Sequence, residues 1–127
     1  MANVTASHAA YRRGEVLAAT PGQLVVLLYD GARRFLRQGA VAMREGQVER
    51  AHNSLRAGER IISHLDGTLD YEQGELPQRL HAIYQFCLRH LNQARLQQDA
   101  LSVDEVSELL GELREAWSEV AAEVERG

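Results

Sequence analysis

Residues 48–69, VERAHNSLRAGERIISHLDGTL, decide the fold class of this chain of 127 residues. Small or apolar residues recur there at alternating steps of three and four: Val48, Ala51, Leu55, Gly58, Ile62, Leu65 and Leu69. This spacing places them on one face of an α-helix. The stretch therefore predicts a helix that ends within residues 66–74, where two glycines and several turn-forming residues stand together.

A first long helix is predicted upstream, from about Pro21 to Glu45. Thr20 and Gln23 have the spacing of a capping box, and Pro21 suits the first helical position. The expected inner face carries Leu24, Leu28, Gly31, Phe35, Gln38 or Gly39, and Ala42. Gly46 then supplies the left-handed residue with which helices commonly end.

Two further helices are predicted after the loop. The third begins at Pro77 and ends near Gln98 and Asp99, with an apolar face of Leu80, Ile83, Tyr84, Cys87, Leu88, Leu91 and Ala94. The fourth begins at a second capping box, Ser102 to Glu105, and reaches almost to Gly127. Its apolar face is Val103, Val106, Leu110, Leu113, Trp117, Val120 and Val124.

Four helices of about 20 to 25 residues, each about 30 to 37 Å long, pack most economically as an antiparallel bundle when short loops join them. We therefore predict an all-α fold, with residues 20–127 forming an antiparallel four-helix bundle as a single domain. Residues 1–19 are Ala-rich and weakly patterned. They are predicted to form a separate N-terminal arm with a short helix.

Composition narrows the classes of function. The net charge is −4 and every basic residue is Arg, so the sequence predicts no nucleic-acid partner. The longest uncharged apolar run, residues 24–29, is far shorter than the roughly 18 to 20 residues of a membrane span, so no membrane insertion is predicted. A lone Cys87 and the lack of a secretory signal favour the reducing cytoplasm.

The sequence offers no convincing catalytic or metal site. Glu49 and His52 have the Glu-x-x-His spacing of di-metal bundle enzymes, but no second such pair exists and Ala51 takes the core position. Cys87 falls on an inner face, where a thiol behaves as a small hydrophobe. We predict no catalytic residue, no metal, no other cofactor and no small-molecule substrate. A metal-binding bundle enzyme is the disfavoured alternative.

Eight apolar residues fall outside the tightest helical rows: Val25, Val26, Leu27, Val41, Ile61, Phe86, Leu96 and Leu101. Wider helix faces account for such a surplus as well as a binding surface does. The arm adds Tyr11, Val16 and Leu17, which fit a groove between helices as a partner's amphipathic helix would, or complete the core as a fixed lid. These residues favour a protein that holds another protein's segment.

One string of residues resembles a known family. The most specific element is Leu28-Tyr29-Asp30-Gly31-Ala32; residues 11 and 16–24 precede it, and residues 113–117 agree in order and spacing. Over nearly its whole length the chain resembles the FliS family of flagellar secretion chaperones. It departs from the family at Arg95, where Asn is common, and at Gly74, which stands alone where a Gly pair is frequent.

The resemblance implies a cytoplasmic export chaperone that binds the disordered C-terminal segment of flagellin, prevents premature polymerisation and helps deliver flagellin to the flagellar type III export apparatus. A disordered segment that folds as it binds loses about 2 to 5 kcal/mol of the interaction energy to its own ordering. Tight binding of flagellin is therefore expected to need an extended contact. The candidate contact residues are Tyr11, Val16, Leu17, Ile61, Tyr84, Leu88, Leu91 and Ala94. Tyr11 is also a candidate regulatory lid. The alternative function is a helical adaptor or regulator that binds another amphipathic segment.

Overall fold

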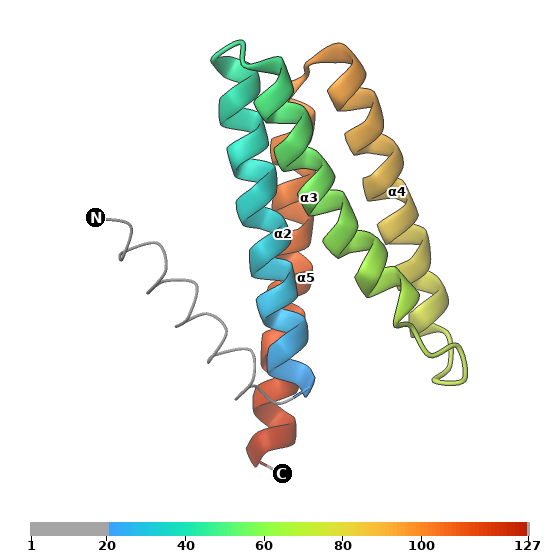
Figure 1. Cartoon of the computed structure of the whole chain (residues 1–127). Helices are drawn as coiled ribbons and strands as arrows, with labels where there is room; N and C mark the ends of the chain where they lie inside the picture. The colour runs from blue at the N-terminus through green and yellow to red at the C-terminus, as the bar shows by residue number, and fades with distance from the viewer. Residues whose placement is uncertain (1–20, 127) are drawn as a thin grey trace.

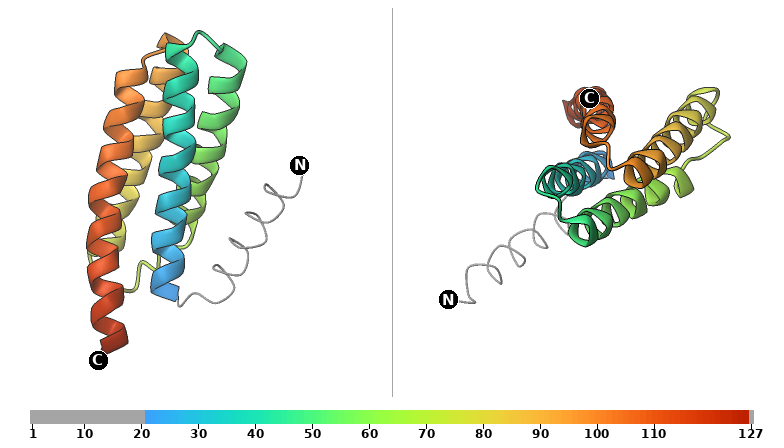
Figure 2. Two further views of the ribbon diagram at one scale, coloured as in Figure 1. Left: turned by 90° about the vertical axis from the view of Figure 1, so that its left-hand side faces the viewer. Right: turned by 90° about the horizontal axis from the view of Figure 1, so that it is seen from above.

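The computed structural model describes residues 21–126, which form four α-helices and no strand. They are α2 (Pro21–Arg44), α3 (Val48–Gly67), α4 (Leu76–Gln97) and α5 (Ala100–Arg126) (Figure 1). Successive helices run in opposite directions, and α2 and α4 each pack on α3 and α5 (Figure 2). The predicted all-helical fold is confirmed for this range. The predicted arm, residues 1–19, and Thr20 lie outside the described residues.

The buried rows of α3 and α4 follow the sequence pattern. On α3 the predicted row is buried from Ala51 to Leu65, and on α4 the central positions Tyr84, Cys87 and Leu91 are at most 1% exposed. Val48 was predicted to be in the core but is 58% exposed, because it stands at the first residue of α3, at the end of the bundle.

The inner face of α2 differs from the prediction by about one residue. Its buried apolar row is Val26, Tyr29, Ala32, Leu36, Ala40, Ala42 and Met43. The expected core residues Leu24, Leu28 and Phe35 are only half-buried. Because α2 packs between α3 and α5, its buried face must serve two neighbours, and its centre points between them.

Two glycines allow α2 and α3 to approach closely. A Cβ atom at Gly39 would lie 2.9 Å from Leu55 Cδ2, and one at Gly58 would lie 2.9 Å from Leu36 Cδ2. A larger residue at either position would displace a fully buried leucine. Each glycine thus accommodates a leucine of the opposite helix.

Helix α5 begins three residues before the predicted start, because Asp99 is its capping residue. The Asp99 carboxylate accepts hydrogen bonds from the Ser102 amide (3.2 Å) and the Ser102 hydroxyl (2.7 Å). Hydrogen bonds from Ser102 lower the pKa of Asp99. The predicted capping box from Ser102 to Glu105 is therefore wrong: Ser102 already lies within the helix, and Glu105 faces His90 Nε2 at 3.4 Å.

The last turns of α5 extend beyond the end of the bundle (Figure 2). Val120 and Val124 were predicted to lie on the inner face, but they are 50% and 74% exposed. The reason is that fewer neighbouring helices cover α5 after Trp117, which is itself partly buried against the core. The overhang leaves apolar side chains at this end of the molecule.

Candidate functional site

An apolar groove lies at the end of the bundle where α2 begins, α3 ends, α4 begins and α5 ends. It consists of two adjoining hollows of about 170 and 260 Å³ that share Leu76, Leu80 and Trp117. We call it the basal groove. It is lined by Val25, Leu65, Thr68, Leu69, Asp70, Gln73, Leu76, Pro77, Leu80, Tyr84, Leu113, Ala116, Trp117 and Val120.

Helical spacing places the apolar walls of the basal groove. Leu76 is the first residue of α4 and Leu80 follows one turn later, so both side chains lie on one face of the helix. On α5, Leu113, Trp117 and Val120 follow at steps of four and three. Since α4 and α5 pack against each other in opposite directions, the two rows meet and leave a hollow with entirely apolar lining.

Part of the groove is exposed and part belongs to the core. Leu76 is 58% exposed and Val120 is 50% exposed, whereas Leu80 is only 5% exposed. Leu113 and Trp117 are half-buried and pack against the core. The groove therefore presents accessible apolar surface whose inner wall is held in place by the packed interior.

Two tyrosines hydrogen-bond beneath the groove. The Tyr29 and Tyr84 hydroxyls share a buried hydrogen bond, and Tyr84 also lines the groove. Burial raises the pKa of Tyr29, and burial together with the hydrogen bond to Tyr29 raises the pKa of Tyr84. Both phenols are therefore neutral at physiological pH and serve as a structural hydrogen-bonded pair.

A polar cluster beside the groove fixes α3 to α4. Asp66, near the end of α3, lies 2.7 Å from His81 Nδ1 and accepts a hydrogen bond of 3.1 Å from Gln85 Nε2. The Thr68 hydroxyl donates to the Leu65 carbonyl at 2.8 Å, within the turn that closes α3. These bonds hold in place the edge of the groove formed by Leu65 and Leu69.

The structure brings one of the eight predicted contact residues to the basal groove, namely Tyr84. Leu91 and Ala94 lie further along α4 and are at most 1% exposed, while Ile61 and Leu88 are half-buried. Ile61 lies on the side of α3 that meets α2, since a Cβ at Gly31 would be 3.4 Å from Ile61 Cδ1. Tyr11, Val16 and Leu17 lie outside the described residues.

The other groove residues were missed as binding candidates, among them Leu76, Leu113, Trp117 and Val120. The last three had been assigned to a continuous inner row of the fourth helix. The available signal was that this row runs longer than its neighbours can cover, because α2 begins only at Pro21 and α4 only at Leu76. Leu76 carried no periodic signal, since it stands at the junction of loop and helix.

The described residues hold no cluster that matches the disfavoured metalloenzyme. Within residues 21–126, no three His, Cys, Asp or Glu side chains are arranged to hold a metal ion, and Glu49 and His52 are exposed. Burial raises the pKa of Cys87 to about 11, so this buried thiol stays protonated near neutral pH. In the same range, the helices lack an apolar segment of the length that a membrane crossing requires.

A helical bundle with an apolar groove at one end has the features of proteins that hold a segment of another protein. Comparison with known proteins gives the family. A family model for the flagellar protein FliS matches residues 1–124. The chain is 34% identical, over 112 residues, to the flagellar secretion chaperone FliS of Bacillus subtilis (strain 168); the match covers 88% of this chain and 84% of that protein.

Two further relatives agree. The flagellar secretion chaperone FliS of Salmonella typhimurium is 34% identical over 108 residues, which cover 84% of this chain and 80% of that protein. The flagellar secretion chaperone FliS of Escherichia coli (strain K12) is 35% identical over 106 residues, which cover 82% of this chain and 78% of that protein. The chain therefore belongs to the FliS family of flagellar secretion chaperones. The resemblance seen in the sequence is confirmed, and with it the prediction that the chain is not an enzyme.

Proposed function

We propose that this chain is a cytoplasmic export chaperone that binds the C-terminal segment of flagellin and helps deliver flagellin to the flagellar type III export apparatus. The observation that carries the proposal is the basal groove, whose apolar wall includes the exposed side chains of Leu76 and Val120. Exposed apolar surface within a groove is typical of sites that bind another protein. Membership of a secretion-chaperone family supports the same conclusion.

An amphipathic flagellin segment supplies the complement of such a groove. Its apolar side chains are buried only when it packs against a partner, so before export they favour premature association. The two hollows, of about 170 and 260 Å³, hold a few side chains and not a whole segment. Binding therefore extends along the bundle flanks, where Ile61 and Leu88 remain candidate contacts beside Tyr84 at the groove.

We infer that residues 1–19 act as an arm, separate from the bundle of residues 20–127, that competes with flagellin for the basal groove. Helix α2 begins at the same end of the bundle as the groove, and Val25 in its second turn lines the groove (Figure 1). A segment that precedes Pro21 thus has a short path to it. Tyr11, Val16 and Leu17 are the candidate occupants, with Tyr11 as the lid, while Leu91 and Ala94 become contacts only if the bundle opens.

The experiment is a calorimetric titration of the full chain, and of a chain that lacks residues 2–17, with a peptide of the flagellin C-terminal segment. We expect micromolar or tighter binding, strengthened by the deletion because a competing lid lowers the apparent affinity. Absence of binding at micromolar concentrations contradicts the chaperone function and favours an adaptor for another segment. Unchanged or weaker binding after the deletion contradicts the lid hypothesis but not the chaperone function.

A further inference from the structure

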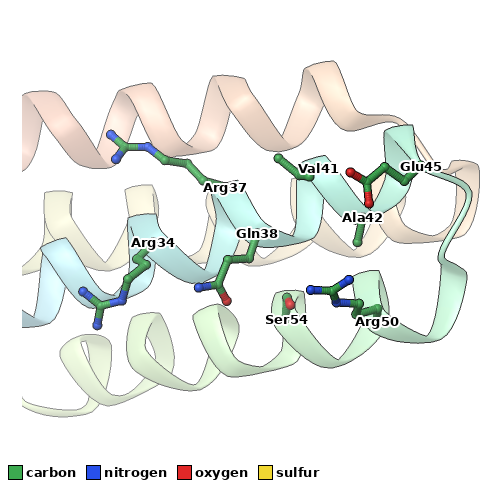
Figure 3. A pocket seen from close by; sticks show the side chains of 8 residues that line it. All are labelled: Arg34, Arg37, Gln38, Val41, Ala42, Glu45, Arg50 and Ser54. Carbon is green, nitrogen blue, oxygen red and sulfur yellow. The ribbon is translucent and has the colours of Figure 1, made fainter. Parts of the chain in front are cut away.

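A second groove lies on the outer face between α2 and α3, nearer the other end of the bundle. Its volume is about 440 Å³, and we call it the arginine groove; it is lined by Arg34, Arg37, Gln38, Val41, Ala42, Glu45, Arg50 and Ser54. Figure 3 shows Gln38 projecting from α2, and Arg50 and Ser54 from α3, into the space between these helices. Arg37 is directed away from α3.

The arginines of this groove lack carboxylate partners. Among residues 21–126, neither Arg34 nor Arg37 forms an ion pair, and the guanidinium carbon of Arg34 lies 6.0 Å from the centroid of the Phe35 ring. Within the described part of the chain, Arg50 donates only to the neutral Gln47 amide oxygen, at 2.8 Å. The lining thus holds three guanidinium groups and one carboxylate, that of Glu45, an excess of two positive charges; Arg34 and Arg50 border the space between the helices, and Arg37 points away from α3.

Other arginines of α2 are used by the fold. Arg33 donates to the Ser107 carbonyl at 3.0 Å, and Arg44 pairs with Asp104 at 2.5 Å. Both contacts join α2 to α5. The arginine groove is therefore not explained by the need to hold α2 in the bundle, and its charges remain available to a partner.

We propose that the arginine groove binds an acidic amphipathic helix of a partner protein. This helix is a different segment from the apolar one that we assign to the basal groove. Val41, which is 52% exposed, and the mostly buried Ala42 beside it form an apolar strip among the arginines. A guest helix laid along the groove between α2 and α3 buries its apolar residues on that strip and brings carboxylates, one turn apart, to the guanidinium groups. Arginine–carboxylate hydrogen bonds are charge-assisted and often bidentate, which favours carboxylates over neutral polar groups.

A second copy of this chain is a poorer occupant. Its most acidic element is α5, which carries Asp104, Glu105, Glu108, Glu112, Glu115, Glu119, Glu123 and Glu125. The groove lies between α2 and α3, so pairing it with α5 of another copy joins two different faces. A head-to-tail contact of this kind leaves one groove and one α5 unused at the ends of the assembly, unless the rotation between copies closes it. The charges therefore fit a separate acidic segment better.

The test uses a fluorescent synthetic helical peptide with glutamates one turn apart beside a row of leucines, titrated by anisotropy against the full chain. We expect saturable binding that weakens from about 50 mM to about 300 mM salt. The triple variant Arg34→Glu, Arg37→Glu, Arg50→Glu is expected to bind about tenfold more weakly or worse. The matched control, Arg89→Glu, reverses an exposed charge on α4 outside the groove and stays within about twofold of wild type.

A second variant, with glutamine at the same three positions, is also expected to bind the peptide more weakly than wild type. Its helix content, measured by circular dichroism, should be unchanged. The proposal is overturned if the wild type fails to bind the peptide at about 100 µM. It is also overturned if the triple variants bind the peptide with wild-type affinity, or if Arg89→Glu loses as much affinity as they do. Equal binding of a peptide with Gln in place of Glu would overturn it as well. Wild-type oligomers in sedimentation that dissociate in the triple variant would assign the groove to a second copy instead.

Discussion

Tyr29 of α2 and Tyr84 of α4 share a hydrogen bond between their hydroxyls across the diagonal of the bundle, with ring centroids 6.5 Å apart. Both side chains are at most 1% exposed. The main neighbours of α2 and α4 are α3 and α5, so this bond links two helices that stand opposite each other. Because Tyr84 also lines the basal groove, the pair couples the core to the binding surface.

Replacing either tyrosine by phenylalanine is expected to lower the free energy of unfolding by about 1 to 3 kcal/mol, because the remaining hydroxyl loses its bond to the other tyrosine in the core. The double variant Tyr29→Phe, Tyr84→Phe should cost less than the sum of the two single changes, since it leaves no orphaned hydroxyl. Urea unfolding of the four proteins measures the coupling. Strictly additive costs would contradict a shared bond.

Stability is predicted to fall in mild alkali. Burial raises the pKa of Cys87 from 9.0 to about 11 and also raises the pKa of Tyr29 and Tyr84 above 10.0. In this range the unfolded chain releases protons that the folded chain retains, so the stability present below pH 9 is lost as the pH rises. Cys87→Ala should remove about 2 to 3 kcal/mol of the decline up to pH 11.

The measurement is the free energy of unfolding from pH 8 to pH 11, in the presence of a reductant, for the wild type and Cys87→Ala. The variant is expected to be less stable near neutral pH, because it loses buried volume, but to have the shallower pH dependence. Parallel pH profiles for the two proteins would refute the contribution assigned to the thiol.

Gly39→Ala is predicted to destabilise the bundle by about 1 to 3 kcal/mol, although alanine favours helices by about 1 kcal/mol. The new Cβ would lie 2.9 Å from Leu55 Cδ2 and 3.1 Å from Leu55 Cγ, so the fully buried Leu55 side chain or the two helices must shift. The control is Gly67→Ala, at the end of α3, where a Cβ meets nothing within 4 Å. Thermal unfolding should show the control unchanged or stabilised, and equal melting temperatures for both variants would count against the close contact.

Arg95, where the family resemblance led us to expect Asn, has a partner on α3. Its Nη1 lies 2.6 Å from Glu59 Oε1, and the two side chains are 15% and 11% exposed. Arg95→Asn should cost about 1 to 3 kcal/mol, because it leaves the largely buried Glu59 carboxylate, among residues 21–126, with only Arg56 as an ion-pair partner, 3.9 Å away. Glu59→Gln in the Arg95→Asn background should recover part of the loss, whereas an unaltered unfolding midpoint in Arg95→Asn would contradict the pair.

The sequence predicts the elements of this fold better than their mutual arrangement. The prediction that the α3 row from Ala51 to Leu65 is buried was correct, because steps of three and four residues keep these side chains on one narrow face of the helix. Helix α2 packs on both α3 and α5, so the centre of its buried face, at Tyr29 and Leu36, depends on where α5 lies. The α5 cap was ambiguous because Asp99 and Ser102 both suit a helix start; the left-handed Gln98, which ends α4, places the new helix directly after Asp99.

The candidate site was harder to predict for the same reason. Leu76 and Val120 are far apart in sequence, and each alone is an ordinary apolar residue near a helix end. Only the antiparallel packing of α4 on α5 brings them to one hollow with Leu80 and Trp117. Family resemblance drew attention to Tyr84, which does reach the groove, but periodicity gave no means of separating surface apolar residues from core ones.

The central claim is that the basal groove holds flagellin's C-terminal segment, and titration calorimetry with that peptide tests it most directly. Leu76→Glu and Val120→Glu place a charge on exposed residues of the groove, while Leu96→Glu places one on a residue that is 77% exposed at the opposite end of α4. We predict that each groove variant weakens binding about tenfold or more and that Leu96→Glu changes it by less than about twofold, with helix content unchanged in all three. Wild-type affinity in both groove variants, or an equal loss in Leu96→Glu, would contradict the account.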